Sequence, residues 1–249
     1  MENFISAAIV TYNDLEKVRD AYFSIKENTK RYPLKLYIID NGSLDGTVEF
    51  FKDFDVTIIQ NGKNLGFGAA HNKALNLPLG KYHFIINPDI KISSDVLSDM
   101  TDFMEENKDI CLAMPQILSS DGTVQYLPKE IPTAKYLFLG RFFNSIRREY
   151  IWADKELKGP TEIDFCSGCF MCIKSESFVS LCGFDERYFM YLEDADLTLR
   201  AKKLGKVVIN PNISVSHMWE RESSKKLKYL LIHISSAVKF LRKRRRKEI

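Results

Sequence analysis

The chain has 249 residues, of which 45% are hydrophobic, so it is long and apolar enough to bury a substantial core in one large domain. This composition excludes a disordered or low-complexity protein. The formal net charge is +3, and much of the positive excess lies in residues 239–249, so the charge belongs to one end of the chain and not to the fold. We expect no nucleic-acid partner.

The N-terminal residues and the cysteines indicate a cytoplasmic protein. Residues 1–10 show no basic segment and no cleavage site, so no secretory signal is expected, and no run of 18 uncharged apolar residues predicts a transmembrane helix. The five cysteines are an odd number, which argues for a reducing compartment and against a disulfide framework. The spacing of Cys166, Cys169 and Cys172 would suit a metal or iron–sulfur site with Cys182, but their apolar neighbours favour a buried strand.

The first half of the chain alternates short apolar segments with amphipathic ones. Strands are predicted at residues 6–10, 34–39, 56–60 and 82–86, and helices at residues 14–28, 43–52, 68–76 and 94–107. This alternation predicts an α/β fold with a parallel sheet covered by helices.

The second half of the chain is less regular. Strands are predicted at residues 111–115, 165–174 and 207–209, and a loop leading into a helix at residues 184–204. Between the first two strands, the polar and aromatic residues 119–160 are predicted to form a lid or a binding loop, because long connections in compact domains are usually functional. No repeat or linker divides the chain, so we expect one domain over residues 1–224, followed by a basic segment over residues 225–249.

Two of the predicted strands end in carboxylates. Asp40 ends the strand at 34–39, at the edge where open parallel sheets bind ligands, and its carboxylate could accept a hydrogen bond from a pyrimidine imide or could cap the next helix. Asn87-Pro-Asp89 follows the strand at 82–86. A carboxylate there could hold a divalent cation on a diphosphate, although the triplet alone is more typical of a turn.

A third acidic group opens the predicted helix near residue 193. Glu193, Asp194 and Asp196 follow the aromatic run Tyr188-Phe-Met-Tyr191. Acids in a first helical turn can simply favour the helix dipole, but the aromatic setting favours a pocket that holds a general base. His217 lies just beyond a predicted strand, and an imidazole near acidic metal ligands is a common arrangement.

Together these segments resemble the inverting family-2 glycosyltransferases of the GT-A fold, and in particular the branch that contains rhamnosyltransferases. The resemblance rests on short phrases spread over roughly residues 5–224. In chain order they are Ile9-Val-Thr-Tyr-Asn13, Ile39-Asp-Asn-Gly-Ser43, Asn64-Leu-Gly-Phe-Gly-Ala-Ala-His-Asn72, Asn87-Pro-Asp89, Ser167-Gly-Cys-Phe-Met171, Gly183-Phe-Asp185, Tyr191-Leu-Glu-Asp-Ala-Asp-Leu197 with Arg200, and His217. The resemblance implies a Rossmann-like, mostly parallel sheet flanked by helices.

The resemblance also implies roles for individual residues. Asp194 matches the catalytic base, and Asp89 with His217 would bind Mg²⁺ or Mn²⁺, with Asn87 in place of the first acid of the family's Asp-x-Asp motif. His71 departs from the family, where asparagine is common. The residues implied to hold the nucleotide-diphosphate sugar are Thr11, Tyr12, Asn13, Asp40, Asn41, Asn64, Gly66, Phe67, Asn72, Asn87, Glu193 and Asp196.

The implied reaction transfers a sugar with inversion to a hydroxyl of a glycan or polyprenyl-linked glycan in cell-surface polysaccharide synthesis. The branch favours dTDP-L-rhamnose as donor, and UDP-galactose, UDP-glucose and UDP-GlcNAc stay open. An inactive nucleotide-sugar-binding scaffold is disfavoured because the acids are all present. A nucleotidyltransferase is disfavoured because Thr11-Tyr-Asn-Asp14 is neither glycine-rich nor basic.

The C-terminal segment predicts an amphipathic helix with basic ends. Six basic residues, 242–247, follow an apolar stripe, which suits a helix lying on the inner face of the membrane. The alternative is that the stripe docks on the catalytic domain or on a second copy of the chain, which would make a homodimer. The residues of the stripe are Leu227, Leu230, Leu231, Ile234, Val238 and Leu241.

Overall fold

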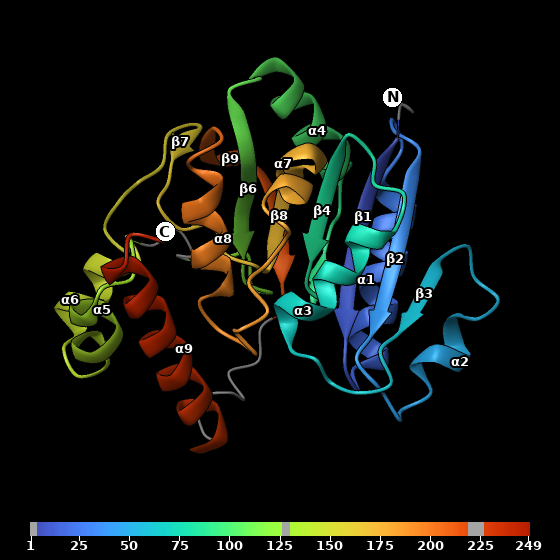
Figure 1. The fold of residues 1–249 in the computed structure, drawn as a ribbon. Helices are drawn as coiled ribbons and strands as arrows, with labels where there is room; N and C mark the ends of the chain where they lie inside the picture. The colour runs from blue at the N-terminus through green and yellow to red at the C-terminus, as the bar shows by residue number, and fades with distance from the viewer. Residues whose placement is uncertain (1–3, 126–129, 219–226) are drawn as a thin grey trace.

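The computed structural model describes residues 4–125, 130–218 and 227–249. Within these ranges one sheet of nine strands runs through the protein in the order β3-β2-β1-β4-β8-β6-β9-β5, with β7 paired to β9 (Figure 1). The strands are β1 (Ile5–Thr11), β2 (Leu34–Asp40), β3 (Thr57–Gln60), β4 (Tyr82–Ile86), β5 (Ile90–Lys91), β6 (Ile110–Leu118), β7 (Thr161–Glu162), β8 (Phe170–Lys174) and β9 (Lys206–His217).

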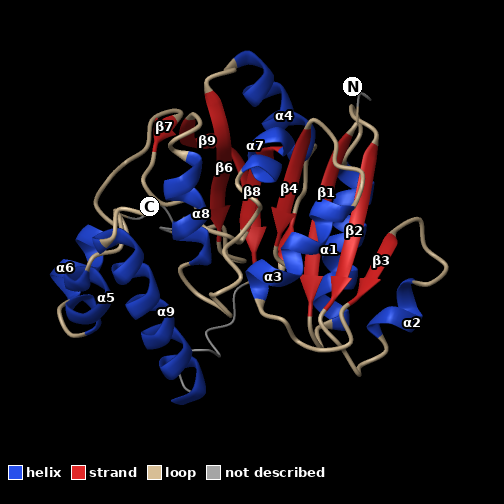
Figure 2. Ribbon diagram, in the orientation of Figure 1, coloured by secondary structure: helices blue, strands red, loops and turns tan. Residues whose placement is uncertain are grey.

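Helices lie against the sheet and at one end of it (Figure 2). They are α1 (Leu15–Asn28), α2 (Thr47–Phe51), α3 (Phe67–His71), α4 (Val96–Glu106), α5 (Ala134–Phe138), α6 (Asn144–Tyr150), α7 (Ser175–Ser180), α8 (Glu193–Ala201) and α9 (Leu227–Arg245), with the 3₁₀ turns η1 (Asn72–Asn76) and η2 (Leu139–Arg141). The α/β fold expected from the alternating sequence is confirmed.

The sheet is mixed. The pairs β1·β2, β1·β4 and β2·β3 are parallel, as the first half of the chain predicts, and β6·β9 is parallel as well. The strand β8 lies between β4 and β6 and is antiparallel to both. This insertion places the segment before β8 at the carboxyl end of β4, which matters for the site described below.

The strand β1 is buried along its whole length and shows why the helices settle on both faces. Ala7 and Ile9 pack in the main core cluster with residues of α1, whereas Ala8 and Val10 pack in a second cluster with Ala70. Because successive side chains of a strand point to opposite faces, an unbroken apolar run requires cover on both sides.

The second half of the chain differs from expectation at three places. The strand expected at 165–174 begins only at Phe170, because the backbone N–H groups of Cys166 and Gly168 donate hydrogen bonds to side chains of α8. The strand β9 is far longer than the segment expected at 207–209. Residues 134–150 of the expected loop form α5, η2 and α6, which Tyr136 and Tyr150 join by stacking at 5.0 Å. Cys166, Cys169 and Cys172 lie in the main apolar cluster.

The helix α9 packs on the domain beside α5 and α6 (Figure 1). Its Ala237 and Phe240 are buried in a third cluster with Tyr188, Leu192 and residues of α8. Among the described helices, none combines the length and apolarity needed to cross a bilayer.

Candidate functional site

The parallel strands β1, β2 and β4 end at one edge of the sheet, and the predicted donor residues begin there. Asp40 is buried, and its carboxylate accepts hydrogen bonds from the backbone N–H groups of Gly42 and Ser43 at 3.0 and 3.1 Å. Gly42 has φ of +83° and lies against Lys63, so the turn requires glycine. Asp40 therefore stabilises the turn that follows β2, and it does not cap the next helix, α2, whose N-cap is Gly46.

The loop after β1 lies over this turn. Asn13 has φ of +53°, and its side-chain oxygen accepts the N–H of Leu44 at 2.7 Å, so it ties the two loops together. Thr11 is buried, and its hydroxyl makes no hydrogen bond to the described residues. Tyr12 is half exposed. Thr11 and Tyr12 are thus the two residues of this loop with polar groups or rings left for a ligand.

The segment from Asn64 to Phe67 is held by its own asparagines and by the loop before α8. The side chain of Asn41 donates to the carbonyl of Gly66 at 3.2 Å, and that of Asn64 accepts the N–H of Gly66 at 2.9 Å. Gly66 has φ of +87° and no room for a Cβ, which would lie 2.1 Å from the carbonyl oxygen of Phe189. The N–H of Phe67 donates to that same oxygen at 3.0 Å.

Asn72 makes a second link to the same loop. Its amide exchanges two hydrogen bonds with the backbone of Phe184, at 2.8 and 2.9 Å, and donates to Glu186. His71 beside it is fully buried, and burial lowers its pKa to about 3, so the imidazole is neutral. Through these hydrogen bonds Asn41, Asn64 and Asn72 stabilise the loops at the carboxyl edge of the sheet.

Asp89 and His217 meet through the antiparallel pair β5·β9, in which Ile90 lies opposite His217. The Nε2 atom of His217 is 3.2 Å from Oδ1 of Asp89. Burial alone would raise the pKa of Asp89, but the hydrogen bond and charge of His217 lower it overall. No local pattern predicts the register of this pairing, since the two residues are far apart in the chain.

The side chain of Gln125 orients the imidazole ring of His217. Its amide nitrogen donates to the carbonyl of His217 at 3.0 Å, so its oxygen is the atom 3.0 Å from Nδ1, and Nδ1 carries a proton. In this orientation Nε2 faces the carboxylate of Asp89, and the carboxylate with a deprotonated Nε2 is a donor set that a Mg²⁺ or Mn²⁺ ion could use. Over the described ranges no three acids, histidines or cysteines converge as a complete metal site, so the remaining ligands would come from diphosphate oxygens or water.

A short chain of hydrogen bonds joins this edge to the acids of α8. The N–H of Asn87, at the end of β4, donates to the carbonyl of Cys169 at 2.9 Å. One residue earlier, the N–H of Gly168 donates to Oδ2 of Asp194 at 3.1 Å, and a Cβ on Gly168 would meet Phe67. The antiparallel insertion of β8 thus brings the predicted base next to the predicted diphosphate and metal residues.

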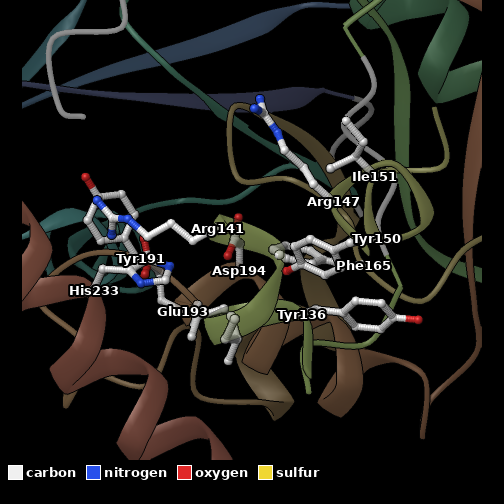
Figure 3. A pocket seen from close by; sticks show the side chains of 13 residues that line it. Tyr136, Arg141, Arg147, Tyr150, Ile151, Phe165, Tyr191, Glu193, Asp194 and His233 are labelled. Atoms are coloured by element: carbon white, nitrogen blue, oxygen red, sulfur yellow. The ribbon is translucent and has the colours of Figure 1, made fainter. Parts of the chain in front are cut away.

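Asp194 opens onto a cavity of about 470 Å³ at the N-terminus of α8 (Figure 3). Tyr191 and Leu192 have φ of +71° and +68°, and this left-handed pair turns the chain into α8. Burial and the charge of Asp194 raise the pKa of Tyr150, so its hydroxyl stays protonated. The cavity is lined by Tyr136, Leu137, Gly140, Arg141, Arg147, Tyr150, Ile151, Phe165, Tyr191, Leu192, Glu193, Asp194 and His233.

Asp196 lies away from this cavity. It is fully buried, accepts a hydrogen bond from Arg200 at 2.7 Å and pairs with Lys243 of α9, which also bonds Asp185 at 2.8 Å. Both carboxylate oxygens are therefore engaged within the protein, and we assign Asp196 to joining α8 with α9 instead of to the donor. Glu193, by contrast, lines the cavity beside Asp194.

Sequence reasoning missed the residues that α5, η2, α6 and α9 contribute to the cavity. The signal was the unusual length and aromatic content of residues 119–160, which predicted a binding loop but named no residue. Those it missed are Tyr136, Arg141, Arg147, Tyr150 and His233.

Comparison with known proteins places these features in a family. The sequence profile of Glycosyl transferase family 2 matches residues 6–181, well over half of the chain. The chain is 27% identical over 238 residues to the N-acetylglucosaminyl-diphospho-decaprenol L-rhamnosyltransferase of Mycobacterium tuberculosis, covering 87% of this chain and 76% of that protein. It is 31% identical over 157 residues to the rhamnosyltransferase WbbL of Escherichia coli K12, covering 58% and 57%.

Solved structures share the fold at low identity. The structure of GalNAc-T7 with UDP, GalNAc and Mn²⁺ superposes with a TM-score of 0.67 at 16% identity, covering 88% of this chain and 44% of that one. The structure of residues 1–349 of TarS from S. aureus with UDP superposes with a TM-score of 0.63 at 14% identity, covering 94% and 65%. This chain therefore spans less than half of the length of GalNAc-T7 and about two thirds of that TarS chain.

Proposed function

The chain belongs to Glycosyl transferase family 2, and we propose that it moves a sugar, L-rhamnose from dTDP-L-rhamnose, with inversion onto a hydroxyl of a lipid-linked glycan. It is a glycosyltransferase, and two of its relatives are rhamnosyltransferases. The donor and acceptor proposed here come from those relatives.

One observation carries the proposal: Asp194 opens onto the cavity and is bonded through Gly168 to the strand end that leads to Asp89. A carboxylate that lies between the cavity and the proposed cation site at Asp89 is well placed to act as a general base. In the proposed step the acceptor hydroxyl oxygen attacks the anomeric carbon and gives its proton to Asp194, while the bond to the nucleoside diphosphate breaks on the opposite face. Such a base typically contributes about 10²–10⁴-fold to the rate.

The metal requirement is part of the proposal. Asp89 and Nε2 of His217 would hold Mg²⁺ or Mn²⁺, and Gln125 would keep the imidazole oriented. The ion would neutralise the charge that develops on the leaving diphosphate. The structure of GalNAc-T7 with UDP and Mn²⁺ supports the use of a divalent ion in this fold.

The experiment is a screen of nucleotide sugars with purified protein, measuring release of nucleoside diphosphate with and without a lipid-linked acceptor. We expect dTDP-L-rhamnose to be turned over fastest, in a manner that depends on the acceptor. Preferred turnover of UDP-galactose, UDP-glucose or UDP-GlcNAc would show that the proposed donor is wrong, while the proposed glycosyltransferase activity would stand. Donor binding without turnover of any sugar would favour the inactive scaffold.

We further propose that α9 rests on an anionic membrane surface on the cytoplasmic side. Leu227, Leu231, Ile234 and Val238 follow one another at helical spacing and are all exposed, although α9 docks through another face. Of the six basic residues 242–247, Lys243 is buried in ion pairs, so at most five remain for lipid phosphates, at about 1 kcal/mol each.

Liposome co-sedimentation tests this contact. The full chain should co-sediment with vesicles that contain anionic lipid at low salt and should dissociate from them at high salt. The matched variant replaces Leu231 and Ile234 with serine, which removes exposed apolar surface without touching the docked face. Equal, salt-independent sedimentation of the two proteins would remove the proposal.

A further inference from the structure

The helix α9 runs along the loop that leads into α8. This loop, residues 181–192 of the described chain, forms no helix or strand, and it joins α7 to the acids of the cavity. One face of α9 meets it at successive turns, because positions three and four residues apart lie on the same side of a helix. The contacts are, in chain order of α9, the ring of His233 against that of Tyr191 at 5.4 Å, the hydroxyl of Ser236 to the carbonyl of Met190 at 2.8 Å, the ammonium of Lys239 to the carbonyl of Arg187 at 2.5 Å, and Lys243 to Asp185 at 2.8 Å. The loop therefore lies antiparallel to α9 and is held by it at four points.

The end of this loop has a backbone conformation that needs support from its surroundings. Tyr191 and Leu192 have φ of +71° and +68°, and residues with a side chain keep such values only when neighbouring contacts hold them there. The ring of Tyr191 meets His233, and Leu192 is buried in the cluster that contains Phe240. Both residues of the left-handed pair are thus supported by α9. Because α8 begins directly after them, this support also fixes where Asp194 lies.

The same loop holds the predicted donor segment. The carbonyl oxygen of Phe189 accepts the N–H of Phe67 at 3.0 Å, and a Cβ on Gly66 would lie 2.1 Å from that oxygen. Phe189 directly precedes Met190, whose carbonyl accepts the hydroxyl of Ser236. A shift of the loop at Met190 would therefore move the carbonyl against which the turn at Gly66 is built.

We propose that Ser236 is a positioning residue for the reaction, through which α9 acts on both halves of the site. By holding the carbonyl of Met190, Ser236 fixes the loop that places Asp194 at one end and supports the turn at Gly66 in its middle. Ser236 is buried and lies outside the cavity, so it acts through the loop and not by contact with a ligand. This inference rests on the proposed function, since it assigns a further residue to the same site.

The alternative is that α9 only adds to the stability of the domain. Apolar contacts such as those of Ala237 and Phe240 would be enough for that role. They would not explain why two polar side chains of α9, Ser236 and Lys239, bond to main-chain carbonyls of an irregular loop. A hydrogen bond to a carbonyl restrains the path of the loop itself, and that path carries the contact with the donor segment.

The test compares Ser236→Ala with Ser235→Ala in the full chain. The two serines are neighbours in α9, but Ser236 is buried and bonded to Met190, whereas Ser235 is exposed. Both substitutions change helix propensity equally, so the variants differ in the contact with the loop. Three quantities are measured: the amide proton resonance of Phe67 by NMR, the affinity for dTDP and UDP by calorimetry, and kcat and donor KM for sugar transfer. Circular dichroism shows that each variant is folded under the conditions of the assays.

We expect Ser236→Ala to shift the amide proton of Phe67 upfield, because its hydrogen bond to Phe189 lengthens when the loop is released. Affinity for the nucleoside diphosphate and kcat should each fall at least about fivefold, the factor that corresponds to one net hydrogen bond, and donor KM should rise. Ser235→Ala should match the wild type in every measurement. A contribution to stability alone would change neither kcat nor KM, since both variants are folded in the assay.

Two results would overturn the proposal. One is a Phe67 resonance that stays in place in Ser236→Ala, and the other is a kcat and donor KM that stay at the wild-type values or change equally in the two variants. Absence of sugar transfer by the wild type would refute the proposed function instead. The link between Ser236 and Phe67 would then still be decided by the NMR measurement, which needs no substrate.

Discussion

The ion pairs between α8 and α9 give a sharp prediction for Lys243→Met. Lys243 reaches Asp185 at 2.8 Å and also pairs with Asp196, which is fully buried. Methionine keeps most of the aliphatic stem, so the substitution removes the charge with little loss of packing. The matched control is Lys247→Met, which removes the same charge at an exposed position of the same tail.

The expected loss of unfolding free energy depends on which cationic partners Asp185 and Asp196 retain after the substitution. Removing one partner of a buried pair costs about 3–5 kcal/mol when the other charge is left uncompensated. Here Asp196 still has Arg200 at 2.7 Å, and Asp185 still has Arg187 at 2.6 Å. About half of that cost is therefore expected, so Lys243→Met should lower the free energy of unfolding by about 2 kcal/mol, and Lys247→Met by less than about 0.5 kcal/mol.

Urea unfolding at pH 7 measures both values, followed by circular dichroism. A fall in the midpoint at constant slope for Lys243→Met alone would agree with the reasoning. Adding Asp196→Asn completes a double-mutant cycle, in which Lys243→Met should cost less once Asp196 is neutral. If Lys243→Met and Lys247→Met were indistinguishable, the buried pair would not hold α9 to α8.

Three further predictions concern catalysis and pH. Asp194→Asn should lower kcat by at least about 10²-fold with donor KM changed by only a few fold, and near-normal turnover would move the base to Glu193. Turnover should stop in excess EDTA and in Asp89→Ala, and undiminished activity in EDTA would refute the metal site. Burial raises the pKa of Asp185, but hydrogen bonds from Arg187 and Lys243 lower it overall. Stability from Asp185 is therefore complete above its unfolded pKa of about 3.9 and falls below it, so acid unfolding should begin near pH 4 and be less steep in Lys243→Met.

The parts of the fold that could be predicted are those in which one local pattern decides the structure. The apolar run of β1 is buried on both faces, and a short run of that kind, rich in β-branched residues, is typical of a central strand. The helix α1 likewise follows from Val18, Ala21, Tyr22 and Ile25, which share one buried face. The antiparallel direction of β8 could not be predicted, because it depends on the path of residues 119–160 and not on the strand itself.

In the candidate site, too, some features could be predicted from the sequence and others could not. The acids at the strand ends and before α8 could be named because their residue types and neighbours carry chemistry. The contact of Asp89 with His217 depends on the β5·β9 register, which no local pattern encodes. Lys243 stands in a run of six cations, and nothing in such a run indicates which one is buried beside Asp196.

The helix α9 shows how one amphipathic pattern can serve several contacts. Its Phe240 and Lys243 hold it to the domain, its His233 lines the cavity beside Asp194, and its Leu231 and Ile234 are exposed. An enzyme bound to a membrane through that exposed stripe would hold the helix that lines the cavity, through His233, at the membrane surface. The proposed base would then lie within reach of a sugar displayed on the membrane, and loss of α9 would impair catalysis as well as attachment. The proposed membrane contact and the ion pairs to α8 would then depend on one helix, and Lys243→Met would separate them because it should weaken the ion pairs while leaving the exposed stripe intact.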